Sequence, residues 1–153
     1  MRVPVFLADN HVAFETLYHP PAYTAQRRAS HLHVPGRQLV KCVLLRAPAG
    51  YLLAVLPADA RIDLAALGQT LGGPVRLATT EEIPEVFRDC EWGALTPFGS
   101  LYGLATVLDD ALDPEALIVF EGHSHAEAIR MRCRDFERLE RPRRLRFARR
   151  QHP

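Results

Sequence analysis

Apolar and polar positions along the chain follow two periods, and together they predict a mixture of strands and helices. Residues 39–46 and 51–56 are almost continuously apolar, and Ala47-Pro48-Ala49-Gly50 lies between them. Such a pair of runs around a short Pro/Gly-containing segment predicts a β-hairpin. Strands this apolar are usually covered on both faces. Shorter apolar runs predict further strands at 14–19, 75–78, 104–108, 117–120 and 126–131.

Capping residues mark the expected helices. Asp63 fits the N-cap of a helix ending near residue 71, and Gly72 follows it in the position that favours a left-handed C-cap. Thr79 and Glu82 have the spacing of a capping box, which starts a helix ending near residue 87. Other helices are expected at 4–12, at 24–32 with Thr24 as N-cap, and at 134–140. Because strands and helices do not alternate regularly, the pattern predicts an α+β domain with a mixed, largely buried sheet.

Size and composition fit one globular domain over residues 1–153. The chain is 48% apolar and 24% charged, an ordinary composition for a folded domain. Three cysteines without paired spacing argue against a disulfide framework. No apolar run reaches the roughly 18 residues of a membrane span, and the N-terminus lacks the pattern of a signal peptide. We therefore expect a soluble, cytoplasmic protein.

Charge is distributed unevenly along the chain. Residues 1–129 carry nine basic and fifteen acidic side chains, a net −6, whereas residues 130–153 carry ten arginines against three acids, a net +7. An arginine-rich C-terminal tail at 141–153 is what a contact with RNA phosphates needs, and Arg143, Arg144 and Arg146 are the candidate contacts. A solvated tail would have the same composition, and both interpretations stay open.

Lys41 stands out among the basic residues. The chain has eighteen arginines and this single lysine, which lies within the first predicted hairpin strand. A bias toward arginine exchanges lysine wherever chemistry permits, so a surviving lysine suggests a need for a compact ammonium group. A buried charge also needs an acid, solvent or a bound anion as its partner. Cys42 would face away from Lys41 because side chains alternate along a strand, so packing suits it better than nucleophilic catalysis.

The stretch from Trp92 to Ser100 contains Gly93, Pro97 and Gly99. Glycine allows backbone N–H groups to converge on an anion, and proline stiffens the segment. Such a loop can stabilise the oxyanion of an ester undergoing hydrolysis. An ordinary tight connection has the same composition, so the loop alone does not decide between these interpretations.

Histidines occur as His31-x-His33 and His123-x-His125. Paired histidines are common in zinc sites, but no Cys-x-x-Cys accompanies them here. Surface or pocket histidines are therefore favoured, and we expect neither a metal ion nor a cofactor. His123 is the histidine expected nearest to a substrate.

The motifs occur in a distinctive order. It runs through Val40-Lys41-Cys42, Asp63-Leu64, Val75-Arg76-Leu77, the Gly-x-x-x-Pro loop at 93–97, Val107-Leu108-Asp109, Phe120-Glu121-Gly122-His123 and Ile129-Arg130-Met131. This order and spacing resemble the YbaK and prolyl-tRNA synthetase-associated domain family over about residues 24–139. The resemblance implies an α+β domain with a partly barrel-like sheet flanked by helices.

The resemblance also implies an activity, hydrolysis of the ester that joins an amino acid to a mischarged tRNA. The family's lysine maps onto Lys41 and its loop onto residues 93–97, so the resemblance implies catalytic roles for Lys41, Gly93, Ala94 and Pro97. The implied substrate-binding residues are Leu95, Thr96, Phe98, Gly99, Gly122 and His123. The implied partners are mischarged tRNA and prolyl-tRNA synthetase.

Two departures from the family pattern concern specificity. Cys42 replaces a hydroxyl residue common after the lysine, and His-Ser-His follows Gly122. A stiff loop suits steric exclusion, which favours a small amino acid such as alanine, cysteine or serine on tRNA-Pro. No Ser-His-Asp set is evident, so the neighbouring ribose hydroxyl could activate water. The alternatives are a non-catalytic nucleic-acid-binding module and a metal-dependent hydrolase using His123 and His125.

Overall fold

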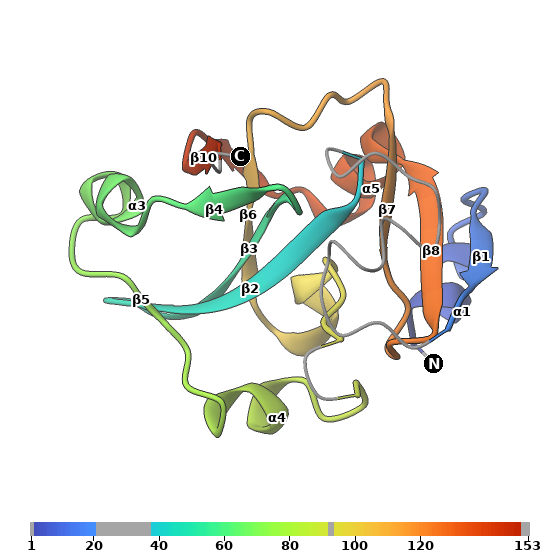
Figure 1. Ribbon diagram of the computed structural model, residues 1–153, viewed down its shortest axis with the longest axis horizontal. Helices are drawn as coiled ribbons and strands as arrows, with labels where there is room; N and C mark the ends of the chain where they lie inside the picture. The colour runs from blue at the N-terminus through green and yellow to red at the C-terminus, as the bar shows by residue number, and fades with distance from the viewer. Residues whose placement is uncertain (1, 21–37, 92–93, 151–153) are drawn as a thin grey trace.

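Three β-sheets and four α-helices make up the part of the chain that the computed structural model describes, residues 2–20, 38–91 and 94–150 (Figure 1). The helices are α1 (Arg2–Asp9), α3 (Leu64–Leu71), α4 (Glu82–Val86) and α5 (Cys133–Glu140), with a short 3-10 helix η1 (Gly99–Tyr102). The strands are β1 (Glu15–Tyr18), β2 (Val40–Ala47), β3 (Gly50–Pro57), β4 (Ala60–Ile62), β5 (Arg76–Leu77), β6 (Ala105–Asp109), β7 (Leu117–Glu121), β8 (Glu127–Arg132), β9 (Arg143–Leu145) and β10 (Ala148–Arg150).

The sheets confirm the expected α+β class. The largest sheet has the order β5-β2-β3-β6-β9 and is mixed, because β3–β6 and β6–β9 are parallel pairs and the others are antiparallel. A second sheet, β1-β8-β7, is antiparallel, and β10 pairs with β4 in a two-stranded ribbon. An isolated parallel bridge between Leu39 and Val119 joins the start of β2 to β7. Sequence periodicity predicts one sheet, whereas the strands divide into three.

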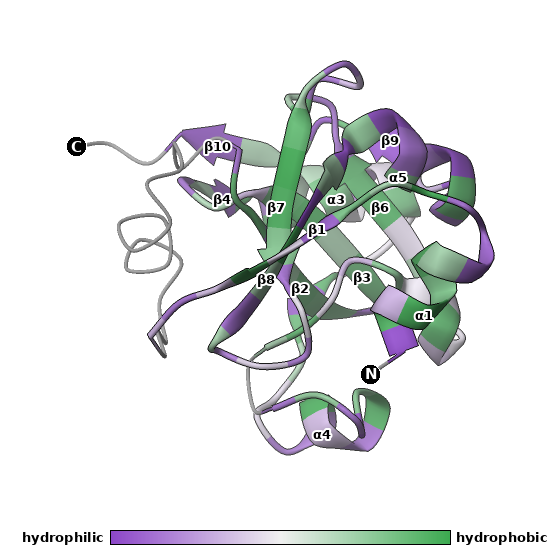
Figure 2. Ribbon diagram, turned by 90° about the vertical axis from the view of Figure 1, so that its right-hand side faces the viewer, coloured by the Kyte–Doolittle hydropathy of each residue, from purple (hydrophilic) through white to green (hydrophobic). Residues whose placement is uncertain are grey.

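Three apolar clusters lie between these layers. The main core packs α1, α5, η1 and one face of the large sheet together, and includes Leu44, Leu53, Phe98 and Phe136. The opposite face of that sheet packs against α3 and the β4–β10 ribbon around Leu67 and Phe147. Figure 2 shows this arrangement as hydrophobic central strands β3, β6 and β7, with more hydrophilic β9, β10 and α5 outside them.

A third, smaller cluster lies where the two larger sheets meet, at the parallel bridge. It contains Leu39, Ala58, Val119 and Ala128, with Leu17 packed against it. Side chains alternate along a strand. The residues two positions from Leu39 and Val119 therefore lie on the same strand faces as these two members of the cluster.

Local capping explains two of the helices. The Asp63 carboxylate accepts a hydrogen bond from the Ala66 N–H, and Gly72 ends α3 with a left-handed φ of 84°. At α4, Thr79 and Glu82 exchange reciprocal side chain–backbone hydrogen bonds of 3.2 and 2.8 Å. Both predicted capping arrangements are confirmed. The predicted helix at 24–32, with its Thr24 cap, lies outside the described residues.

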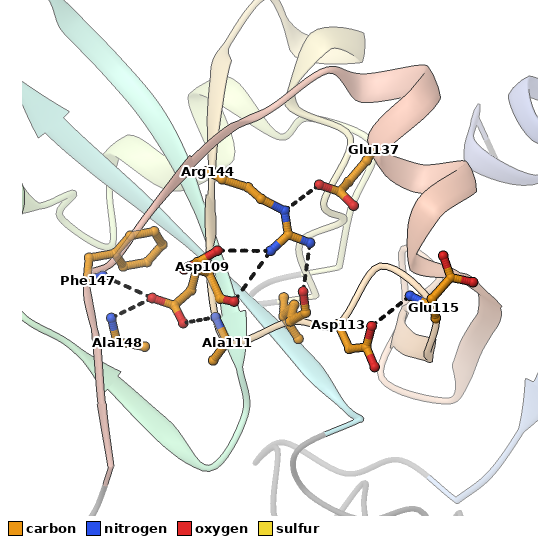
Figure 3. A network of polar contacts seen from close by, with 10 residues as sticks. Asp109, Ala111, Asp113, Glu115, Glu137, Arg144, Phe147 and Ala148 are labelled. Carbon is orange, nitrogen blue, oxygen red and sulfur yellow. Dashed lines mark hydrogen bonds and ion pairs between the residues drawn. The ribbon is translucent and has the colours of Figure 1, made fainter.

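The prediction of a C-terminal tail was wrong for residues 141–150. Within this segment β9 extends the large sheet, and β10 pairs with β4. The Asp109 carboxylate secures it by accepting hydrogen bonds from the N–H groups of Ala111, Phe147 and Ala148 (Figure 3). The composition is that of a solvated segment, but buried Phe147 and the strand pairing decide its structure.

No helix in the described ranges is both long and apolar enough to cross a membrane.

Candidate active site

Lys41 lies near the start of β2, opposite Leu56 of β3. Alternation places it on the strand face that carries Leu39 and Val43, whereas Cys42 packs against the main core. This confirms that Lys41 and Cys42 face opposite ways. Burial lowers the pKa of Lys41, and the nearby Asp59 carboxylate offsets part of that shift. Lys41 is therefore a half-buried cation that a bound anion would stabilise.

The parallel bridge places Lys41 and Glu121 at the same end of the molecule. Leu39 lies opposite Val119, so Lys41 and Glu121 are each two residues beyond the bridge in the same direction. Leu39 and Val119 both belong to the third cluster, and the residues two positions along share their faces. Glu121 is buried and forms an ion pair with buried His125, with 3.2 Å between the Glu121 carboxylate and the His125 Nδ1. This end of the third cluster thus carries both positive and negative groups.

The predicted loop is described from Ala94 onward, because Gly93 lies outside the described residues. Hydrogen bonds hold it against the segment that follows β7. The Ala94 N–H donates to the Glu91 carbonyl, the Glu91 N–H donates to the His123 carbonyl, and the Glu91 carboxylate accepts from the His125 N–H at 2.7 Å. The loop therefore begins beside the Glu121–His125 pair. Within the described ranges, no hydrogen bond or ion pair joins it to Lys41.

Polar groups inside this loop have no partner in the described structure. Thr96 is fully buried, and its hydroxyl makes no hydrogen bond. The backbone N–H groups of Leu95 and Thr96 also find no acceptor among the residues described. Most buried polar groups in native proteins are paired, so unpaired ones require an explanation such as a bound ligand. Three donors close together suit an oxygen atom that develops negative charge.

Phe98 and Gly99 serve the fold. The Phe98 ring is fully buried and packs edge-to-face against Phe6, Phe120 and Phe136. A Cβ atom at Gly99 would lie 2.5 Å from the Thr106 hydroxyl, so only glycine fits there without displacement. Pro97, between Thr96 and Phe98, is also buried. These contacts hold the loop rigidly, and the Phe98 side chain, like those of Ala94 and Thr96, is fully buried.

The segment after β7 has an unusual backbone conformation at a residue other than glycine. The left-handed conformation lies at His123, with φ of 74°, and Gly122 has no positive φ. A residue other than glycine pays a steric penalty there, so contacts must hold it. His123 Nε2 accepts a hydrogen bond from the Val3 N–H at 3.2 Å, and its Nδ1 lies 3.3 Å from the Cys90 sulfur. His123 and His125 therefore have different partners.

A polar cluster surrounds the His123 ring. The Tyr102 hydroxyl donates to the Asp89 carboxylate at 2.6 Å and lies 3.5 Å from the Cys90 sulfur. Burial raises the pKa of the Cys90 thiol to about 11, and it lowers the pKa of His123 despite the nearby Asp89. Cys90 is therefore a thiol at neutral pH, and it is not poised as a nucleophile.

The three candidate RNA-contacting arginines divide into two kinds. Arg144 forms ion pairs with Glu137 and Asp110 and donates to the carbonyls of Asp110 and Leu112, so it holds α5 and β9 to the turn before β7 (Figure 3). Arg143 and Arg146 are exposed, and no carboxylate of the described chain lies within ion-pair distance of either. Of the three candidates, only Arg143 and Arg146 are therefore available to an external anion.

Two surface hollows, of about 380 and 320 Å³, flank the turn of the β2–β3 hairpin. Arg46, Pro48 and Arg76 line the first, while Tyr51, Leu71 and Arg143 contribute to the second. Neither contains Lys41 or any residue of the loop, so neither is assigned to the site.

Sequence reasoning missed the roles of Glu91, Glu121 and Tyr102. A signal existed for Glu121, because strand alternation from Val119 places it on the same face. Glu91 and Tyr102 make contacts with residues 12 to 34 positions away, such as the 2.7 Å bond from the His125 N–H to Glu91. No local pattern reveals such pairs.

Comparisons with known proteins identify the family of the chain. The sequence model of the family described as "Aminoacyl-tRNA editing domain" matches residues 19–139. The chain is 32% identical over 87 residues to a proline–tRNA ligase of Thermosipho africanus, a match that covers 56% of this chain. It spans only 15% of that ligase's length.

Solved structures share the fold. A hypothetical protein, APE2540, superposes with a TM-score of 0.89 at 20% identity, over 97% of this chain and 100% of that one. A protein described as a proposed trans-editing enzyme for prolyl-tRNA synthetase superposes with a TM-score of 0.82 at 24% identity, over 99% and 96% of the two chains. At these identities the likeness shows the fold alone. The family match covers most of the chain, and the protein therefore belongs to the aminoacyl-tRNA editing domain family.

Proposed function

We propose that the protein is an aminoacyl-tRNA deacylase that acts in trans, hydrolysing the ester between a small non-cognate amino acid and tRNA-Pro. Membership of the editing family supports the class of reaction. The observation that carries the proposed site is the group of unpaired donors at Leu95 and Thr96 inside a rigid, buried loop. The proline–tRNA ligase among its relatives supports the choice of tRNA.

The proposed mechanism needs few groups because an aminoacyl ester is already activated. Water attacks the ester carbonyl, and the negative charge that forms on its oxygen is stabilised by the Thr96 hydroxyl and the neighbouring N–H groups. The tetrahedral intermediate then collapses, breaking the bond to the ribose oxygen, which takes up a proton. The adjacent ribose hydroxyl positions and activates the water.

Lys41 is assigned to the nucleic-acid end of the substrate. Its half-buried ammonium group lies at the end of the third cluster, where a terminal phosphate or ribose would complete its pairing. Gly93, Ala94 and Pro97 are proposed to shape the loop around the ester, and Gly122 and His123 to border the pocket. The exposed Arg143 and Arg146 are proposed to contact tRNA phosphates, while Arg144 is occupied by its internal ion pairs.

The proposed specificity for a small amino acid follows from the rigidity of the loop. Ala94, Leu95 and Thr96 are all buried, so a large side chain would have to displace packed groups. Attraction alone discriminates weakly, since one methylene contributes about 1–3 kcal/mol. Steric exclusion therefore favours alanine, cysteine or serine as the amino acid removed.

The test is deacylation of a panel of misacylated tRNAs by the full chain, Lys41→Met and Arg46→Ala. Lys41→Met keeps the apolar stem and removes the charge, and we expect activity to fall by about 10²–10³-fold. Arg46 lies on the same strand, exposed and stacked on Tyr51, so Arg46→Ala should keep its activity. Failure to deacylate any tRNA would falsify the proposed function, and full activity of Lys41→Met would remove Lys41 from the mechanism.

A substrate lacking the adjacent ribose hydroxyl tests the proposed activation of water. We expect it to be hydrolysed much more slowly, and an unchanged rate would exclude that step. A nucleic-acid-binding module without catalysis is the second candidate, favoured by Arg143 and Arg146. It predicts salt-sensitive tRNA binding with no deacylation.

A further inference from the structure

Asp89, Cys90 and His123 converge from two distant parts of the chain. The Cys90 sulfur lies 3.3 Å from His123 Nδ1 and 3.8 Å from one Asp89 carboxylate oxygen, and the other oxygen lies 3.7 Å from Nδ1. A tetrahedral zinc ion with bonds of about 2.0–2.3 Å separates its ligand atoms by roughly 3.3–3.8 Å. The sulfur–nitrogen distance fits such a site, and one ligand atom from each residue lies within 4.8 Å of the other two, so a small rotation of the Asp89 carboxylate would complete one face of the site.

We propose that Asp89, Cys90 and His123 bind a divalent transition-metal ion of the zinc type. All three offer a ligand atom within 4.8 Å of the others, and thiolate, imidazole and carboxylate are the donors that zinc accepts. The Tyr102 hydroxyl contacts both Asp89 and Cys90 and so borders the cluster. His123 also borders the pocket of the proposed function, but the metal site is argued from its own contacts and its test measures metal binding rather than deacylation.

The exposure and the charge of the Asp89–Cys90–His123 cluster suit a bound metal ion. Asp89 is exposed and Cys90 is half-buried, so the cluster is open to solvent on one side, while His123 is only 4% exposed on the other. One carboxylate and one thiolate neutralise a doubly charged ion. A coordinating thiol loses its proton on binding, so the proton of Cys90 passes to solvent and affinity rises with pH.

The hydrogen bond from Val3 determines which nitrogen of the His123 ring carries the proton. The Val3 N–H donates to His123 Nε2, so the neutral ring carries its proton on Nδ1. For Nδ1 to bind metal, that proton must be lost and Nε2 must be protonated instead, which removes the acceptor from Val3. Val3 is fully buried in the first turn of α1, where N–H groups have no acceptor within the helix, so its N–H would lose its partner unless the start of α1 shifts. Metal binding and the start of α1 are therefore coupled.

The backbone of His123 supplies a suitable variant. Its φ of 74° favours glycine, so His123→Gly removes the imidazole and also relieves the steric penalty at that position. Folding of this variant is checked by circular dichroism. Cys90→Ser is a second, nearly isosteric variant.

The experiment is titration of the full chain with Co²⁺ alone, followed by competition with Zn²⁺. We expect one equivalent to produce a near-ultraviolet thiolate-to-cobalt charge-transfer band and the visible bands of a four-coordinate ion. Cys90→Ser and His123→Gly should each lose the charge-transfer band. Cys133→Ser is the matched control, since it removes a thiol buried in the main core, and it should keep the band.

Hydrogen exchange supplies a second readout. With Zn²⁺ bound, the Val3 amide should exchange faster than in the metal-free protein, because it has lost its acceptor. No band at one equivalent of Co²⁺, or a band that persists in Cys90→Ser, would overturn the site. A band accompanied by unchanged exchange at Val3 would overturn His123 as a ligand.

Discussion

Two buried threonines ten positions apart, Thr96 and Thr106, differ in whether their hydroxyl group is hydrogen-bonded. Thr106 donates its hydroxyl to Glu140 at 2.6 Å, and Glu140 also accepts from the Ser100 N–H and hydroxyl. Thr96 is more deeply buried, yet its hydroxyl has no partner. Because an unpaired buried hydroxyl is costly, the paired Glu140 network serves the fold, whereas the proposed function assigns the unpaired Thr96 hydroxyl to the ester oxygen. Substitutions in each region should therefore affect stability and activity differently.

Gly99→Ala should have the largest effect on stability, because residue 99 lies between the two regions. The added Cβ would meet the Thr106 hydroxyl at 2.5 Å and Leu104 Cβ at 3.3 Å. Overpacking of this kind costs about 1–3 kcal/mol, which urea unfolding would measure. Gly50→Ala is a poor control because its φ of 134° adds strain, so Ala105→Gly at the neighbouring strand serves instead. Wild-type stability in Gly99→Ala would mean that the loop and β6 can separate freely.

Thr106→Val should destabilise the fold by about 1–3 kcal/mol, because it leaves Glu140 with one fewer donor in a buried setting. Thr96→Val is its matched counterpart. It removes a hydroxyl that has no partner, so stability should be unchanged or higher, whereas deacylation should slow markedly. The two variants are compared by urea unfolding and by single-turnover deacylation. A loss of stability in Thr96→Val would show that its hydroxyl is paired within the fold.

Glu140 predicts a smaller, pH-dependent effect. Burial raises its pKa, although the bonds from Ser100 and Thr106 oppose the shift. The folded state therefore holds this proton more tightly than the unfolded state does. Its contribution to stability is present at low pH and is lost as pH rises from the ordinary pKa of a glutamate through the raised value. Glu140→Gln should flatten this part of the profile of unfolding free energy against pH, and an identical slope in both proteins would contradict the assignment.

The exposed arginines predict the smallest change in stability. Arg143→Ala should leave the free energy of unfolding within about 0.5 kcal/mol, because the side chain is exposed on an edge strand. It should weaken tRNA binding and lower the dependence of binding on salt. Arg144→Ala should instead destabilise the protein, since it breaks the pairs with Glu137 and Asp110. Equal effects of both variants on tRNA binding would argue against separating their roles.

Local features could be predicted from the sequence because a few adjacent residues determine them. The hairpin of β2 and β3, the Asp63 cap and the Thr79–Glu82 capping box are of this kind. Lys41 became a candidate through its rarity among the basic residues, and strand alternation predicts which face of β2 it lies on. Contacts between distant residues could not be predicted, because no local pattern relates Cys90 to His123, 33 positions apart.

Amino-acid composition was a poor guide to local structure at two places. Arginine-rich residues 141–150 read as a tail, although Phe147 and the Asp109 carboxylate bind this segment into the fold. His123 adopts a left-handed backbone with its ring held by Val3 and Cys90, although the neighbouring Gly122 is the residue type that favours that conformation. In both cases the contacts of a single side chain determine a local structure that the amino-acid composition around it does not favour.

The position of β9 has a consequence for how the chain matures during synthesis. Strand β6 pairs on one side with β3, which is made much earlier, and on the other with β9, which is made later. The edge of β6 that pairs with β9 therefore stays without a partner, and the Asp109 carboxylate lacks the Phe147 and Ala148 N–H groups, while the chain emerges from the ribosome as far as α5. Exposed strand edges promote association between nascent chains. Translation pauses just before β9 would lengthen that interval and should lower the yield of folded protein.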